Sequence, residues 1–224
     1  MKAAAVIVAA GSSRRMGFDK LMAPLAGKPV VDWSLGAAQA CGDIESIVLV
    51  CAEERIPEFT RMAGSFPKVL RVVAGGAERS ASVLMGLGAL AGMAPDLVAV
   101  HDAARPLVSA ALFSAVLDAA AKNGAASAAH AVTDSLHRTG ACDALVETVS
   151  RENLFAMETP QAARFGLLLN AVRRHGAGAT DEVGALIASG VHPVPVVHGG
   201  PNLKITVPDD LRVAGDFLRR RGEG

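Results

Sequence analysis

The sequence predicts an α/β fold in which a mostly parallel sheet is covered by helices on both faces. Short aliphatic runs alternate with longer amphipathic runs along almost all of the 224 residues. This alternation is typical of strands that are joined by helical crossovers. Hydrophobic residues make up 51% of the chain but aromatic residues only 4%, which suits aliphatic strands packed between alanine-rich helices.

The short aliphatic runs are the expected strands. The first, AAAVIVAA at residues 3–10, contains Val6, Ile7 and Val8, and β-branched side chains favour a strand because they pack well on a pleated surface. These residues could also form the apolar core of a signal peptide, but a charged loop follows at once, so we expect a buried strand. Further strands are expected at residues 46–52, 69–76, 97–103, 126–132, 191–199 and 202–207.

The longer runs are the expected helices. The clearest is residues 109–124, where Ser109 can cap the first turn and Asn123-Gly124 can end the helix. The others are expected at residues 30–42, 53–65, 79–92, 162–175, 180–189 and 209–221. No repeat, low-complexity stretch or linker interrupts the pattern, so we expect one Rossmann-like domain over residues 1–224.

A polar segment at residues 133–155 breaks the alternation of strands and helices. Thr139-Gly140 is a turn signal with short alternating runs on either side, which predicts a β-hairpin that projects from the sheet as an arm. A lone hairpin of two strands is only marginally stable in water. We therefore expect this arm to pack against something.

Charge and cysteine content exclude several classes of protein. The 22 basic and 22 acidic residues balance, so nothing argues for binding to nucleic acid or to an anionic membrane. Cys41, Cys51 and Cys142 are odd in number, widely spaced and without a C-x-x-C motif, which favours packing roles in a reducing cytoplasm over disulfides or a zinc site. No apolar run reaches the length of a transmembrane helix. The spacing of the histidines does not match that of metal ligands.

Three loops that follow predicted strands combine small residues with charged ones: AAGSSRR, GGAERS and HDAARP. Ligands of an open parallel sheet bind beyond the carboxyl ends of its strands, where these loops would converge. Small residues let backbone N–H groups approach a ligand, and arginine complements phosphate. Neither a P-loop motif nor a G-x-G-x-x-G motif after the first strand is present. The sequence therefore predicts a nucleotide site of another kind.

The ordered motifs resemble those of one family of nucleotidyltransferases. AAGSSRRMG…K, LAGKPVV, GGAERSASV, VHDAARP, TPQ, TDE and NLKITVPDDL follow the order and spacing of 2-C-methyl-D-erythritol 4-phosphate cytidylyltransferases, which serve the non-mevalonate isoprenoid pathway. The resemblance spans nearly the whole chain. It implies cytidylyl transfer from CTP to 2-C-methyl-D-erythritol 4-phosphate, with release of pyrophosphate. It also implies Mg²⁺ as cofactor and a homodimer whose arms, at about residues 133–155, clasp each other.

The resemblance further implies roles for single residues. Arg15 and Lys20 match the cations that hold the triphosphate as charge develops on the leaving pyrophosphate. Lys204 matches the lysine that reaches the reacting phosphates, and Arg151 the arginine that positions the acceptor phosphate. The residues expected to bind CTP are Ala9, Ala10, Gly11, Gly76, Ala77, Ser82 and Ala103. Those expected near the acceptor are Asp102, Arg105, Ser135, Thr159 and Thr180, and Asp102 could hold either Mg²⁺ or an acceptor hydroxyl.

Three positions depart from the family pattern. Ser135 stands where threonine is frequent but keeps the hydroxyl group. Ala77 stands where an acid is common beside the glycines, and its absence could loosen a contact with CTP. The spacing from Arg15 to Lys20 is short, so this loop could close differently.

Two other functions stay open at this stage. One is cytidylyl transfer to a pentitol phosphate such as ribitol 5-phosphate, which would differ at the arm and at TPQ. The other is a regulatory protein that binds a nucleotide but has lost catalysis, against which the retained cations and Asp102 argue.

Some of these polar residues also have an ordinary structural explanation. Asp181 and Glu182 could be first-turn acids that the helix dipole stabilises, with Thr180 as their N-cap. His101, at a strand end, is expected to be a structural histidine.

Overall fold

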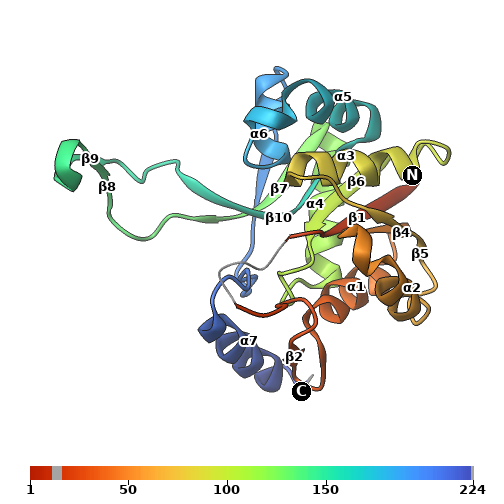
Figure 1. The fold of residues 1–224 in the computed structure, drawn as a ribbon. Helices are drawn as coiled ribbons and strands as arrows, with labels where there is room; N and C mark the ends of the chain where they lie inside the picture. The colour runs from red at the N-terminus through yellow and green to blue at the C-terminus, as the bar shows by residue number, and fades with distance from the viewer. Residues whose placement is uncertain (12–16, 223–224) are drawn as a thin grey trace.

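The computed structural model describes residues 1–11 and 17–222 (Figure 1). Within this part of the chain, seven strands form the main sheet in the order β11-β7-β10-β6-β1-β4-β5. Neighbouring strands are parallel except at β10, which runs antiparallel to both of its neighbours. The strands are β1 (Ala3–Ala9), β4 (Ile44–Cys51), β5 (Val69–Ala74), β6 (Leu97–Asp102), β7 (Ala125–Ala131), β10 (Phe155–Arg164) and β11 (Val194–Val197). The predicted α/β fold with a mostly parallel sheet is confirmed.

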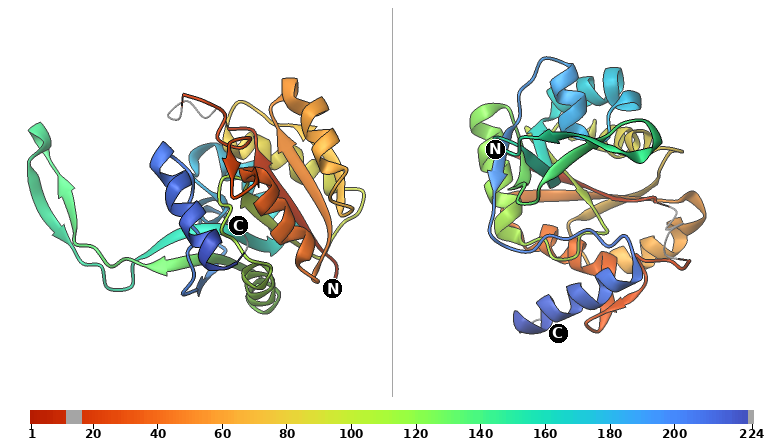
Figure 2. Two further views of the ribbon diagram at one scale, coloured as in Figure 1. Left: turned by 90° about the horizontal axis from the view of Figure 1, so that it is seen from below. Right: turned by 90° about the vertical axis from the view of Figure 1, so that its left-hand side faces the viewer.

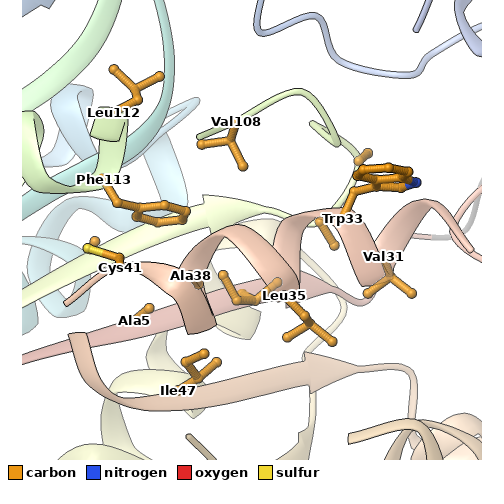
Figure 3. Close-up of a cluster of buried hydrophobic side chains, with 14 of the residues drawn as sticks. Ala5, Val31, Trp33, Leu35, Ala38, Cys41, Ile47, Val108, Leu112 and Phe113 are labelled. Carbon is orange, nitrogen blue, oxygen red and sulfur yellow. The ribbon is translucent and has the colours of Figure 1, made fainter. Parts of the chain in front are cut away.

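Helices cover both faces of this sheet, because alternate residues of each strand pack to opposite sides. In β1, Ala5 and Ile7 pack with α1 and α4, whereas Ala4 and Val6 pack with α3, α5 and α6. Figure 1 shows α3, α5 and α6 on one side of the sheet, and Figure 3 shows the hydrophobic packing of α1 on the other. The helices are α1 (Val30–Ala40), α2 (Ile56–Ala63), α3 (Arg79–Leu90), α4 (Ala110–Asn123), α5 (Phe165–His175), α6 (Glu182–Ala188) and α7 (Pro208–Arg220).

Several local predictions are confirmed by the structure. Ser109 caps α4 by accepting a hydrogen bond from the Leu112 backbone N–H at 3.1 Å. Gly124 ends the same helix with a φ of 89°, which side chains disfavour. Residues 3–9 form a buried central strand, as expected for the first aliphatic run.

No helix among the described residues is both long and apolar enough to cross a membrane.

The polar arm is also confirmed. Strands β8 (Leu136–Thr139) and β9 (Leu145–Val149) pair antiparallel, and the chain turns between them around Gly140. The arm extends far from the sheet beyond β7 and β10 (Figures 1 and 2). Its tip exposes apolar side chains, with Leu145 68% and Val146 62% accessible.

Two predictions about secondary structure are wrong. Residues 202–207 do not form a strand: their backbone bonds run to Ala104 and to the Asp210 carboxylate, which caps the start of α7, instead of to a neighbouring strand. The helix expected at 162–175 begins only at Phe165, because the preceding residues belong to β10. Three polar side chains in β10 are buried through specific hydrogen bonds, so the segment lacks the aliphatic pattern of the other strands.

Candidate active site

A pocket of about 320 Å³ lies at the carboxyl ends of β1, β5 and β6. The described part of the first loop, Ala9 to Gly11, meets the GGAER turn and the start of HDAARP there, as predicted. Lys20 and Lys204 reach the same pocket from elsewhere in the chain. Its lining is Val8, Ala9, Ala10, Gly11, Lys20, Leu21, Gly76, Ala77, Glu78, Arg79, Ser82, Asp102, Ala104 and Lys204.

Small residues bring two of these loops into direct contact. A Cβ atom on Gly75 would lie 2.5 Å from the Ala10 Cβ and 2.7 Å from the Ser82 Oγ, so only glycine fits there. Ser82 fixes the turn from below: its Oγ accepts a hydrogen bond from the Gly76 backbone N–H at 3.1 Å. The close approach of these two loops therefore depends on the missing side chain of Gly75.

Replacing Gly75 with alanine is expected to raise KM for CTP, the substrate that the resemblance of the motifs implies, about tenfold. Overpacking a tight contact costs about 1–3 kcal/mol, and about 1.4 kcal/mol corresponds to a factor of ten. Steady-state kinetics at varied CTP concentration measures the effect. Gly88→Ala is the matched control, because nothing lies within 4 Å of a Cβ there and alanine favours the α3 helix. An unchanged KM in Gly75→Ala would contradict the role of this contact.

Asp102 forms ion pairs with two cationic residues that line the pocket, Lys204 and Arg79. Its Oδ2 accepts a hydrogen bond from Lys204 Nζ at 2.6 Å, and its Oδ1 accepts from Arg79 Nε at 3.0 Å. Burial favours a higher pKa for this carboxyl group, but the charges of Arg79 and Lys204 outweigh burial and hold the pKa well below its usual range. Asp102 is therefore ionised at neutral pH.

Lys20 approaches the same region from the loop after β1. Its Nζ donates a hydrogen bond to the Ile205 carbonyl at 2.8 Å, next to Lys204 in the sequence. The two lysines that were predicted to contact phosphates thus line one pocket, although they lie 184 positions apart in the sequence. Arg15, the third predicted cation, lies outside the described residues.

Comparisons with known proteins show the family of this chain. The family model of 2-C-methyl-D-erythritol 4-phosphate cytidylyltransferase matches residues 3–220. The chain belongs to this family.

Individual relatives are similar to this chain in sequence along nearly their whole length. A 2-C-methyl-D-erythritol 4-phosphate cytidylyltransferase of Pelotomaculum thermopropionicum is 42% identical, covering 98% of this chain and 95% of the relative. The one of Symbiobacterium thermophilum is 40% identical, covering 93% of this chain and 89% of the relative. A solved structure of the enzyme from Thermus thermophilus is 32% identical, with a TM-score of 0.78, and covers 98% of this chain and all of that one. These relatives do not favour the ribitol 5-phosphate alternative.

Arg79 is a pocket residue to which the sequence analysis gave no role. Its guanidinium group also pairs with Glu182, with Nη1–Oε1 at 2.7 Å and Nη2–Oε2 at 2.9 Å. Glu182 is only 2% exposed, so it is a buried ion-pair partner and not an ordinary first-turn acid. Burial favours a lower pKa for Arg79, but the Glu182 and Asp102 carboxylates outweigh burial and raise it. Glu182 on α6 thus holds the Arg79 guanidinium group, and Arg79 in turn orients Asp102.

The motif TDE is held against TPQ by side-chain hydrogen bonds. Gln161 Nε2 donates to Asp181 Oδ2 at 2.8 Å, and Gln161 Oε1 accepts from the Val183 backbone N–H at 3.0 Å. Asp181, and not Thr180, is the N-cap of α6, since its Oδ1 accepts from the Gly184 N–H at 2.8 Å. Thr180 is exposed and lies beside a separate, smaller cavity that Arg79 also lines.

Thr159 is buried beneath the pocket and is not open to it. Its Oγ1 accepts a hydrogen bond from the Asp102 backbone N–H at 3.1 Å and lies 3.0 Å from His101 Nδ1. Burial lowers the pKa of His101 to about 4, so this histidine is neutral and structural, as expected. In this arrangement Thr159 positions Asp102, and direct contact with an acceptor would require its hydroxyl to change partners.

Four other predicted site residues do not line the pocket. Ala103 is fully buried, and its neighbour Ala104 lines the pocket instead. Arg105 donates to the Asn202 carbonyl at 2.7 Å. Ser135 and Arg151 lie in the exposed arm, where Arg151 donates to the Thr133 carbonyl. Neither Ser135 nor Arg151 lines the pocket formed by the described residues of its own chain.

The donor set of the pocket suits a Mg²⁺ ion bound mainly through phosphate. Among the described residues, no group of three or more histidine, cysteine or acidic side chains could hold a metal ion. Mg²⁺ keeps several water ligands and commonly binds through one or two carboxylates together with substrate phosphates. Asp102 and Glu78 are the acidic residues that line the pocket, and both oxygens of Asp102 have cationic partners.

Proposed function

We propose that this pocket transfers a cytidylyl group from CTP to 2-C-methyl-D-erythritol 4-phosphate, giving 4-diphosphocytidyl-2-C-methyl-D-erythritol and pyrophosphate. The observation that supports this most directly is the pairing of Lys204 with Asp102 in a pocket lined by Lys20 and the small-residue loop. Each of these residues lies within residues 3–220, which the family model matches. The retained Lys20, Asp102 and Lys204 argue against a regulatory protein that has lost catalysis.

The reaction requires charge neutralisation more than covalent chemistry. An oxygen of the acceptor phosphate attacks the α-phosphorus of CTP, the bond to the bridging oxygen breaks, and pyrophosphate leaves with the electron pair. Two anions must approach while a third departs, so positioned cations lower the barrier. We assign this role to Lys20, Lys204 and Arg15, with Lys204 moving from Asp102 to the phosphates.

The small-residue loops are the proposed site of the nucleotide. Ala9, Ala10, Gly11, Gly76 and Ala77 offer backbone groups without large side chains, and Ser82 supports the glycine turn. Ala103 would act through the loop backbone that it anchors, since its N–H donates to the Val8 carbonyl at 3.0 Å. Ala77 places no acid directly beside Gly76, which is expected to weaken one contact with CTP.

Enzymes of this family generally use a divalent metal ion, and for this chain we propose Mg²⁺. Asp102 would hold it together with triphosphate oxygens and water. Bound there, Mg²⁺ would neutralise charge on the triphosphate. Lys204 would then have to leave Asp102 for the phosphates, because a metal ion and an ammonium group compete for the same oxygen.

We propose a homodimer of one nucleotidyltransferase domain per chain, clasped through the arms. The exposed Leu145 and Val146 at the arm tip offer apolar surface, and a lone two-stranded hairpin is marginal in water. Arg151, Ser135 and, after rearrangement, Thr159 and Arg105 are the proposed contacts to the acceptor. The cytoplasm remains the expected location, on the basis of the three unpaired cysteines.

A turnover assay with purified protein tests the proposed function. Pyrophosphate release from CTP is measured with methylerythritol phosphate, ribitol 5-phosphate, a sugar 1-phosphate and no acceptor, each with and without Mg²⁺. We expect rapid release only with CTP, methylerythritol phosphate and Mg²⁺. Faster turnover of ribitol 5-phosphate, or of GTP in place of CTP, would contradict the proposal.

A further inference from the structure

A second group of polar side chains lies behind the pocket, around the carboxylate of Glu158. Glu158 is 7% exposed, and its Oε2 lies 2.8 Å from both Asn202 Nδ2 and His198 Nε2. Its Oε1 lies 3.1 Å from His130 Nδ1 and 3.8 Å from Arg105 Nη1. We call these five residues the Glu158 cluster. None of them lines the pocket.

The Glu158 cluster joins segments that are far apart in the sequence. Glu158 belongs to β10, at the base of the arm, whereas Asn202 and His198 lie on the segment that leads to Lys204. Asn202 Nδ2 donates to Glu158 and also to the Thr159 carbonyl at 2.8 Å. The Asn202 carbonyl accepts from Arg105 at 2.7 Å. Asn202 is thereby held on three sides, two residues before Lys204.

The backbone around Lys204 needs such an anchor because it has no neighbouring strand. On the far side, the Ile205 N–H donates to the Ala104 carbonyl at 2.8 Å, and the Ile205 carbonyl accepts from Lys20. On the near side, Asn202 makes three hydrogen bonds: it donates to the Glu158 carboxylate and to the Thr159 carbonyl, and its own carbonyl accepts from Arg105. If Asn202 loses its partner, the backbone before Lys204 has fewer restraints.

Glu158 is also linked along the chain to Asp102, the other member of the ion pair. The next residue, Thr159, holds the Asp102 backbone N–H and contacts His101. Glu158 therefore connects, through Asn202 and through its chain neighbour, to both Lys204 and Asp102. A small displacement of a positioned cation costs a large factor in rate, since the benefit depends on geometry set before the reaction.

We propose that Glu158 is a positioning residue for the transfer step: its hydrogen bond to Asn202 places Lys204 against the reacting phosphates. This inference rests on the proposed function. Nothing in the mechanism requires Glu158 to touch a substrate. The hydrogen bond to Asn202, and not the charge of Glu158, carries the effect, so glutamine should replace it and alanine should not.

The test compares Glu158→Ala with Glu158→Gln in the full-length protein. Glu158→Ala is expected to lower kcat about tenfold or more while KM for CTP changes less than about threefold. Glu158→Gln, which keeps an oxygen for Asn202, is expected to retain kcat within about threefold of the wild type. Asp216→Ala, which removes an exposed ion pair with Arg219 on α7, is the control and should leave kcat unchanged.

A purely structural role would give a different result. In that case Glu158→Ala would lower the melting temperature, yet the folded fraction would keep the wild-type kcat. That outcome, or a Glu158→Gln variant as slow as Glu158→Ala, would overturn the inference. If Glu158→Ala does not fold, Glu158→Asp gives the same test: it keeps the charge but pulls the oxygen away from Asn202, so kcat should fall.

A further comparison separates this inference from the proposed function. Wild-type turnover of CTP and methylerythritol phosphate is measured first, and its absence would reject the proposed function itself. Where the wild type is active, the double variant Glu158→Ala/Asn202→Ala is expected to be about as slow as the slower single variant, because both substitutions break one contact. Fully multiplicative losses would show that Glu158 acts independently of Asn202 and would overturn the inference.

Discussion

Replacing Lys204 with alanine is expected to lower kcat about 10²–10³-fold, the range seen when one preorganised stabilising contact of a transition state is lost. KM for CTP should change far less, because Lys204 pairs with Asp102 in this structure and is proposed to gain its phosphate contact as charge develops. Steady-state kinetics with CTP and methylerythritol phosphate separates the two constants. Lys20→Ala is expected to act in the same direction.

The control for this prediction is Lys122→Ala. Lys122 lies in the last turn of α4, is exposed and does not line the pocket, so its loss should leave both constants unchanged. An unchanged kcat in Lys204→Ala would mean that the lysine serves only to neutralise Asp102. A large rise in KM without loss of kcat would instead place Lys204 in ground-state binding.

The convergence of the loops could be predicted from the sequence because it follows from local rules. Each loop directly follows an aliphatic strand, and parallel strands place their carboxyl ends at one edge. Ala9 to Gly11, Gly76 and Asp102 therefore meet in the pocket as expected. The arm could be predicted for a similar reason, since a turn signal between two alternating polar runs is a short-range pattern.

The side-chain contacts between distant residues could not be predicted in this way. Arg79 and Glu182 are 103 positions apart, and neither GGAERS nor TDE indicates by itself that the two form a buried ion pair. Asn202 and Glu158 are 44 positions apart, and a buried acid between two aliphatic strands has no signature in a hydrophobic pattern. Such partners emerge only once the sheet order is known.

The two errors in secondary structure have a related cause. Residues 202–207 have the composition of a strand, but side-chain hydrogen bonds hold the segment in place of backbone bonds to a neighbouring strand. They involve Asn202 at one end and Asp210 at the other. In β10, Glu158, Thr159 and Gln161 are polar although they are buried, so the segment lacks the hydrophobic pattern that predicts a strand. In both segments specific tertiary hydrogen bonds override the local pattern. Both segments also border the ion pair of Lys204 and Asp102.

Mixing two inactive variants is expected to restore activity, if the arm of each chain completes the pocket of its partner. Arg151 lies in the arm, which extends away from the sheet (Figure 2), and it does not line the pocket formed by the described residues of its own chain. Lys20 does line that pocket. We therefore expect Lys20→Ala and Arg151→Ala to damage opposite partners of a shared site.

In a heterodimer of these variants, one site receives both substitutions and the other receives neither. After subunit exchange of equal amounts, half of the dimers are mixed, so about a quarter of the wild-type activity per chain should return. Native mass spectrometry verifies that heterodimers have formed, and each variant incubated alone is the control. If each site were built from one chain, every site would stay damaged, and mixing would restore nothing. Heterodimers without activity would therefore exclude the shared site, because a mixed dimer in which arms cross between partners must contain one intact set of residues.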